Sequence, residues 1–287
     1  MHALVLSGGG PLAVAWEAGL LAGLAEAGAT ADAADFVLGT SAGAIVGAQI
    51  TTGRTPAMLA AAILEEEKGT PPPGARHYDP AAVAQLPALF AKALGGSGDH
   101  AAARAEVGGQ ALAATTPSEA EEMARVERML GGADWPDRGF GCTAVDVADG
   151  SLRVLGRDSG GTLAQAVAAS CSLPGISPPI TIAGRRYMDG GFGSVANVDL
   201  ARGYDCVLVI CFRPAGPQGE RMTARLEQQV SALRADGAAV EVIFPDVAVQ
   251  DAIGANTMDV RRRPAVTRAA MAQGRALADT VGIFLTA

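Results

Sequence analysis

Lysine is almost absent from this sequence of 287 residues, which has only Lys68 and Lys92, so arginine carries nearly all of the positive charge. Acidic residues outnumber basic ones, and the formal net charge is −8. This balance argues against broad electrostatic attraction to nucleic acid or to anionic lipid, although it permits a local basic patch. We therefore expect no nucleic-acid partner.

Cysteine is also scarce, and its spacing excludes the usual cysteine-based sites. The cysteines show neither C-x-x-C spacing nor a neighbouring histidine, and three of them fall in apolar, strand-like runs where a free thiol acts as a small hydrophobe. The four are Cys142, Cys171, Cys206 and Cys211. We expect no zinc or other metal, no cofactor and no disulfide framework, and a reducing compartment fits this usage.

Long apolar runs are missing as well. The two longest uncharged stretches, 36–53 and 159–184, contain Gly, Ser, Thr or Pro throughout, which is not typical of a membrane span. The first residues lack the basic region that precedes the apolar core of a secretory signal. We therefore predict a cytoplasmic protein.

The first fifty residues predict an α/β fold. Residues 3–6 form a short apolar run like a buried strand, followed by three glycines and a helix over 13–27 that ends at Gly28. A second strand over 36–38 leads into a turn and another helix. This β-loop-α-β-turn-α order predicts parallel strands joined by a crossover helix. We see no linker that divides the chain and predict one domain over 1–287.

Residues 69–137 differ in character from the rest. Three prolines at 71–73 interrupt the chain, and helical stretches follow near 80–94, 101–113 and 118–130, the last with the capping-box spacing of Ser118 and Glu121. No strand pattern appears there. We interpret the segment as a helical insertion or cap beside the core, and a purely structural packing layer is an equal alternative.

Sheet and helix signals alternate again after this segment. Strands are expected over 140–147 and 152–155, joined by a turn at Asp149-Gly150, and a helix over 163–169. Two further buried strands are expected over 207–212 and 240–244, separated by a helix near 220–234. A last helix is expected over 259–278.

Ser41 is the first candidate for catalysis. It lies in the sequence GTSAG at 39–43, between a predicted strand and a predicted helix, the setting that raises a serine hydroxyl above an α/β sheet. A serine nucleophile needs a base, which is usually histidine. The chain has only His2, His77 and His100, and none follows an acid late in the chain, so each is interpreted as a surface or loop residue.

A carboxylate is the remaining candidate for the base. Asp189 precedes Gly190 and Gly191, on a turn that glycine makes easily, and partial burial would raise its pKa enough to accept a proton. An isolated Asp-Gly usually makes only a turn, so the assignment rests on its combination with the other motifs.

Gly8, Gly9 and Gly10 are the candidate oxyanion donors. Three glycines before a helix can direct several backbone N–H groups at one point, as stabilisation of an ester oxyanion requires, although a simple flexible turn would read the same way. The spacing matches neither the phosphate-binding G-x-x-x-x-G-K-[ST] nor G-x-G-x-x-G, so nucleotide binding is poorly supported.

Four ordered blocks resemble the patatin-like phospholipase family: LSGGG at 6–10, GTSAG at 39–43, ASCSLPGISPP at 169–179 and DGG at 189–191. The resemblance implies a three-layer α/β/α fold with a mainly parallel central sheet. It also implies a lipid acyl hydrolase of the phospholipase A or lysophospholipase type, acting through a Ser–Asp dyad and an acyl-enzyme without a metal. By the match, Ser41 is the nucleophile, Asp189 its base, and the Gly8, Gly9 and Gly10 amides the oxyanion hole.

The chain departs from the family pattern at two places. Pro11 and Leu12 stand where the family often has a basic residue, and Ser177 stands where an aromatic is common. An inactive binding or regulatory scaffold is therefore one alternative, and an acyltransferase or thioesterase using the same dyad is another. The arginines at 261–263 are either a solvated helix end or a transient contact with a membrane surface.

Overall fold

The computed structural model describes residues 1–69, 74, 76, 78–95, 100–213 and 217–286. One mixed sheet lies at its centre, in the order β5-β6-β3-β2-β1-β7-β8, with β4 paired to β3. The neighbouring strands β3, β2, β1, β7 and β8 run parallel to one another. The strands β4 and β6 pair antiparallel with β3, and β5 pairs antiparallel with β6. The strands are β1 His2–Leu6, β2 Phe36–Gly39, β3 Gly139–Asp146, β4 Leu152–Leu155, β5 Ile180–Ile182, β6 Arg185–Asp189, β7 Cys206–Ile210 and β8 Ala239–Ile243.

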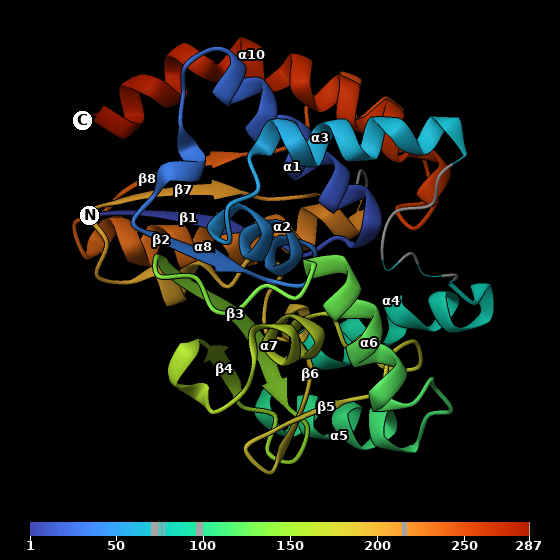
Figure 1. Ribbon diagram of the computed structural model, residues 1–287. Coiled ribbons are helices and arrows are strands. Elements are labelled where there is room, and N and C mark those ends of the chain that lie inside the picture. The colour runs from blue at the N-terminus through green and yellow to red at the C-terminus, as the bar shows by residue number, and fades with distance from the viewer. Residues whose placement is uncertain (70–73, 75, 77, 96–99, 214–216, 287) are drawn as a thin grey trace.

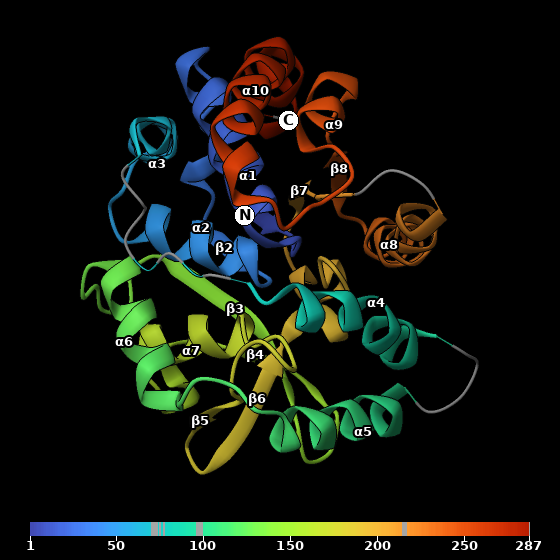
Figure 2. The same cartoon turned by 90° about the vertical axis from the view of Figure 1, so that its right-hand side faces the viewer.

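Helices cover both faces of this sheet (Figures 1 and 2). The helices of the described residues are α1 Gly10–Glu26, α2 Ala42–Thr51, α3 Pro56–Glu65, α4 Pro80–Leu94, α5 His100–Ala113, α6 Glu119–Leu130, α7 Leu163–Ser170, α8 Pro217–Ala235, α9 Val247–Ile253 and α10 Arg263–Thr286. Short 3-10 turns occur between several of them.

The side chains of β1 alternate between the two faces of the sheet, so the strand contributes to a core on each face. Leu4 and Leu6 point into a core shared with α1, α2, α7 and α10, whereas Ala3 and Val5 point into a second core shared with α8. The expected three-layer α/β/α architecture with a mainly parallel sheet is therefore confirmed.

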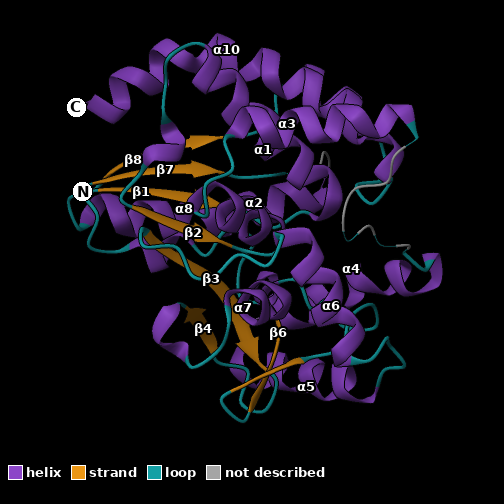
Figure 3. Cartoon of the chain, viewed as in Figure 1, coloured by secondary structure: helices purple, strands orange, loops and turns teal. Residues whose placement is uncertain are grey.

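The helices α4, α5 and α6 belong to the predicted insertion, and Figure 3 shows no strand between them. Within the described part of 69–137 the structure is entirely helix and loop, as predicted, and the Ser118–Glu121 capping box is present. A third core joins α4 and α5 to the ends of β3 and β6, where Phe90 stacks on Phe192 at a centroid distance of 4.3 Å. The prolines at 71–73 and His77 lie outside the described residues.

Several elements differ from the sequence expectations. The hairpin of β5 and β6, and the helices α3 and α9, were not predicted. The boundaries of the last helix were wrong, because 260–262 form a 3-10 turn and α10 runs on to Thr286. The β3–β4 hairpin through Asp149-Gly150 is confirmed.

Candidate active site

Ser41 lies at the turn between β2 and α2 with an unusual backbone. Its φ is 52°, in the left-handed region that a residue with a side chain rarely adopts. A Cβ atom on Gly39 would lie 2.5 Å from the Ala44 backbone, and one on Gly43 would lie 2.2 Å from the Leu6 carbonyl oxygen. The two glycines of GTSAG are therefore required so that α2 can pack directly on the sheet.

The end of α7 holds this turn in place. The Ser41 N–H donates to the Ser170 hydroxyl at 2.9 Å, and the Cys171 thiol donates to the Ser41 carbonyl at 3.2 Å. Ser41 itself is 9 % exposed and lines a cavity. Its hydroxyl is thus held at a fixed place while remaining accessible to a substrate.

Asp189 is the last residue of β6 and is 1 % exposed. Its Oδ1 accepts the Gly191 N–H at 2.7 Å, while its Oδ2 has no hydrogen-bond partner. Burial raises the pKa of Asp189 to about 7, and the nearby Ser41 hydroxyl and the Gly191 N–H act to lower it. The two side chains therefore face one another, although no hydrogen bond between them has ordinary geometry, a common state of a substrate-free site.

A buried polar cluster joins the strand that carries Ser41 to the turn that carries Asp189. The hydroxyls of Thr40 and Thr143 lie 2.8 Å apart. The side-chain amide of Asn197 lies 3.1 Å from each of them and 3.2 Å from the Gly190 carbonyl oxygen. Asn197 was not singled out from the sequence, because nothing in its neighbours predicts that a left-handed residue there reaches β2 and β3.

The glycine loop between β1 and α1 approaches the same place. Gly9 and Gly10 have φ values of 155° and 73°, and a Cβ on Gly9 would lie 2.4 Å from the Phe212 ring. The Gly8 N–H donates to the Val195 carbonyl at 2.7 Å, so this amide is already used within the protein. The predicted oxyanion hole is left with the amides of Gly9 and Gly10, and Gly10 opens α1, where N–H groups have no partner inside the helix.

A cavity of about 670 Å³ extends from Ser41 and Gly10 between α1, α2 and α3. Much of its wall is apolar, and the insertion contributes further residues to it. The apolar side chains include Val14, Ile45, Val46, Leu59, Ile63, Met129, Leu173, Ile176 and Met258. Such a cavity can accept a hydrocarbon chain beside the serine hydroxyl.

The two departures from the family pattern have structural explanations. Leu12 is fully buried in the core below α1, so its side chain does not face the cavity. Ser177 is buried and accepts a hydrogen bond from the Arg76 guanidinium at 2.5 Å. The arginines at 261–263 diverge: Arg261 is exposed, Arg262 bonds the Ala252 carbonyl, and Arg263 pairs with Glu66.

The sequence predicts no histidine base, no metal site and no membrane-spanning helix. His2 is in β1 and His100 begins α5, and neither is among the described residues that line the cavity. In the part of the chain that the structure describes, no three His, Cys, Asp or Glu side chains are grouped as a metal site would need. Nor does any described helix have the length and apolar content needed to cross a bilayer.

The chain is similar to known proteins in sequence and in fold. The model of the family described as patatin-like phospholipase matches residues 4–202. Among solved structures, VipD from Legionella pneumophila is 14 % identical with a TM-score of 0.47, and the alignment covers 97 % of this chain and 67 % of VipD. The type III effector protein ExoU is 17 % identical with a TM-score of 0.43, and the alignment covers 98 % of this chain but only 53 % of ExoU. No curated protein matches the sequence. The family match spans well over half of the chain, and the chain therefore belongs to the patatin-like phospholipase family.

Proposed function

We propose that this protein is a lipid acyl hydrolase in which Ser41 and Asp189 form a catalytic dyad. The observation that carries the proposal is the free Oδ2 of a buried carboxylate whose pKa is raised to about 7 and which faces the Ser41 hydroxyl. A group with this pKa is half deprotonated near neutral pH and can accept a proton from an attacking hydroxyl. Membership of a phospholipase family supports the same conclusion.

The proposed reaction has two steps. The Ser41 oxygen attacks the ester carbonyl carbon while Asp189 takes its proton, and the negative charge on the former carbonyl oxygen is stabilised by the Gly9 and Gly10 amides. The tetrahedral intermediate collapses, and the leaving alkoxide takes the proton from Asp189 to leave as the alcohol. Asp189 then takes a proton from water, whose oxygen attacks the carbonyl carbon of the acyl-enzyme. As this second tetrahedral intermediate collapses, Asp189 returns the proton to the Ser41 oxygen, and the fatty acid is released.

We also propose that residues 69–137 cap this site as part of one domain over 1–287. The described residues Gly74, Arg76, Tyr78, Arg125 and Met129 of this segment line the cavity. A segment that served only to pack against the sheet would not need to line the cavity that holds Ser41. The cap would exclude water from the acyl-enzyme until the leaving alcohol has departed.

The four cysteines are free, and three of them are buried, which fits a reducing compartment, so we propose a cytoplasmic location. Because the substrate is a lipid, a transient contact with a membrane surface is part of the proposal. Arg261, which is 86 % exposed at the rim of the cavity, is the side chain best placed to touch such a surface.

A fluorophosphonate probe followed by mass spectrometry tests the nucleophile. We expect labelling of Ser41, and we expect Ser41→Ala and Asp189→Asn each to abolish hydrolysis of a p-nitrophenyl ester while circular dichroism stays unchanged. Ser194→Ala is the matched control: it removes a buried hydroxyl that donates to Gln229, and it keeps the Ser194 carbonyl that accepts from Asn197. Full activity in either dyad variant would overturn the proposal.

A competing alcohol separates hydrolysis from acyl transfer. With glycerol present, a hydrolase releases mainly free fatty acid, and a transferase releases mainly a new ester. We expect free acid, and a preference for the new ester would replace the hydrolase proposal by an acyltransferase with the same dyad.

A further inference from the structure

Positive charge gathers at the cavity of this acidic protein. Among the described residues that line it, five are arginines and two are glutamates: Arg54, Arg76, Arg125, Arg261, Arg263, Glu66 and Glu67. Adding the ion-pair partners Glu122, Asp259 and Arg268 brings the set to six arginines against four carboxylates, a net charge of +2. The whole chain has a net charge of −8, so the charge at this cavity is opposite in sign to that of the protein.

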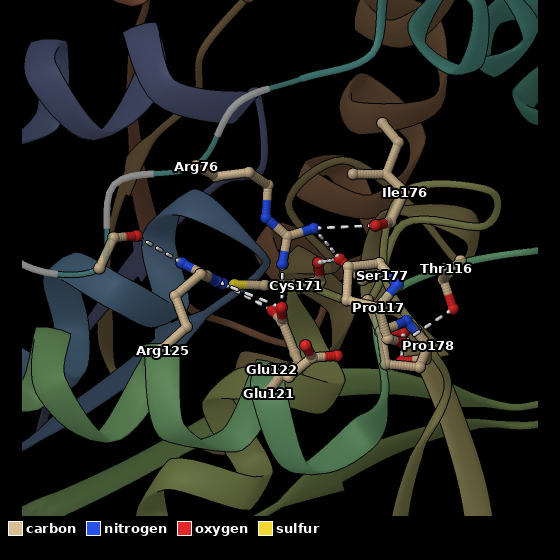
Figure 4. Close-up of polar contacts among 12 residues, drawn as sticks. Arg76, Thr116, Pro117, Glu121, Glu122, Arg125, Cys171, Ile176, Ser177 and Pro178 are labelled. Atoms are coloured by element: carbon tan, nitrogen blue, oxygen red, sulfur yellow. Dashed lines mark hydrogen bonds and ion pairs between the residues drawn. The ribbon is translucent and has the colours of Figure 1, made fainter.

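Two of the arginines are built into the wall beside Ser41. Figure 4 shows Arg76 and Arg125 converging on Glu122 from two sides. Glu122 is 1 % exposed, whereas Arg76 and Arg125 are 11 % and 17 % exposed and line the cavity. The negative member of the cluster is therefore hidden, and its two cations face the space that a substrate would fill.

A short chain of contacts ties this cluster to the nucleophile. Arg76 donates to the Ser177 hydroxyl and to the Ile176 carbonyl at 3.1 Å. The Ser177 hydroxyl in turn lies 3.5 Å from the Cys171 carbonyl oxygen, and the Cys171 thiol contacts the Ser41 carbonyl. The guanidinium is thus held rigidly on the same loop that fixes Ser41.

The cavity offers little to a cationic group. Its two glutamates are both paired, Glu66 with Arg263 and Glu67 with Arg268. Tyr78 is the single aromatic side chain among the described lining residues, whereas recognition of a quaternary ammonium uses several aromatic rings. At the cavity mouth, exposed Arg54 has no acidic partner among the residues that the structure describes.

We propose, building on the proposed hydrolase activity, that Arg76, Arg125 and Arg54 bind an anionic phosphate on the alcohol part of the ester. The site would then favour acyl esters with a net negative head group over zwitterionic and neutral ones. Arginine is suited to this task because its planar guanidinium donates several hydrogen bonds to phosphate oxygens and stays charged. The fatty acyl chain would occupy the apolar part of the cavity between α1, α2 and α3.

Three lysolipids with one acyl chain test this preference: lysophosphatidylglycerol, lysophosphatidylcholine and monoacylglycerol, each below its critical micelle concentration so that no charged interface forms. We expect kcat/KM for the anionic substrate to exceed that for monoacylglycerol. Arg76→Gln and Arg54→Gln should each lower this ratio by roughly threefold to tenfold, the scale of one partly screened charge interaction. Arg202→Gln, which removes a surface arginine paired with Asp236 away from the cavity, is the control.

Glu122→Gln separates the electrostatic role from a structural one. It removes the hidden negative charge and keeps a side chain of the same size, so we expect the anionic preference to rise. If the cluster only holds the fold together, Glu122→Gln and Arg76→Gln should both lower activity on all three lipids equally, and that result would overturn the proposal. A wild-type ratio near one would overturn it as well.

Binding to the Ser41→Ala variant, measured by calorimetry, distinguishes failure of this proposal from failure of the hydrolase proposal. Tighter binding of lysophosphatidylglycerol without turnover by the wild type would retain the anion site and reject the hydrolase. Equal binding of all three lipids would reject the anion site. Inorganic phosphate is added in a further titration: it should weaken binding of lysophosphatidylglycerol and leave binding of monoacylglycerol, which has no phosphate, unchanged. No competition against lysophosphatidylglycerol would reject phosphate as the group recognised.

Discussion

Asp189→Asn is expected to stabilise the protein while it inactivates the site. The folded state holds a carboxyl group whose pKa is about 7, whereas the ordinary value is 3.8. Because the folded pKa is raised, the folded state binds a proton more tightly than the unfolded chain does. The contribution of Asp189 to stability is therefore fully present below pH 3.8, is lost as pH rises toward 7, and stays lost above it.

The magnitude follows from the two pKa values. At about 1.36 kcal/mol for each tenfold change in proton affinity, the difference between 3.8 and about 7 corresponds to about 4 kcal/mol lost at alkaline pH. Asparagine avoids this loss but leaves a buried N–H group unpaired, which costs about 1–3 kcal/mol. We expect Asp189→Asn to be more stable than the wild type by about 1–3 kcal/mol at pH 9.

Urea unfolding followed by tryptophan fluorescence between pH 5.5 and 9 measures this difference, with fully buried Trp16 as a reporter of the core. The gap between variant and wild type should grow by about 2 kcal/mol over this range. Ser41→Ala is the control: it keeps the carboxyl and removes a group that lowers its pKa, so the pH dependence must persist. A gap that does not change with pH would refute the assignment of a raised pKa to Asp189.

Three further predictions concern residues around the dyad. Gly43→Ala should destabilise the fold by several kcal/mol because its Cβ would meet the Leu6 carbonyl, whereas Gly109→Ala, where the added Cβ meets nothing within 4 Å, should stabilise α5 by about 0.5–1 kcal/mol; thermal unfolding of both checks this. Asn197→Gly keeps the left-handed backbone but frees the Asp189 turn, so kcat for an ester should fall by about tenfold to a hundredfold with KM little changed; an equal rise in KM would refute a positioning role. Glu17→Gln should flatten the loss of stability that sets in as pH rises above 4.5, because burial raises the pKa of this carboxyl; an unchanged or steeper loss in urea unfolding would contradict it.

The first half of the candidate site is readable from the sequence because its signals are local. The strands before Gly8 and Ser41 are short apolar runs ended by glycine, and each glycine in GTSAG is needed where the helix meets the sheet. The same alternation of strand and helix predicts an α/β fold with parallel strands, whereas the three layers are what the family resemblance implies.

The other parts of the site could not be predicted because they depend on contacts between distant segments. The hairpin of β5 and β6 has strands of three and five residues, and Arg185 and Arg186 hide any apolar alternation. Asn197 and Arg76 reach the site only through the folded chain. Burial of Asp189 and its raised pKa are expected from the sequence, but which of its oxygens accepts the Gly191 N–H and which stays without a partner depends on the folded chain.

The distances along the chain between the parts of this site have a consequence for folding. The bonded pair Ser41 and Ser170 is separated by 129 residues, and Asn197 and Thr40 by 157. Contacts so far apart form late, because the loops between them must close before any of these bonds can form. During refolding, the helical content should therefore return before esterase activity does. For a time, most of the helices are formed while the site cannot yet catalyse the reaction.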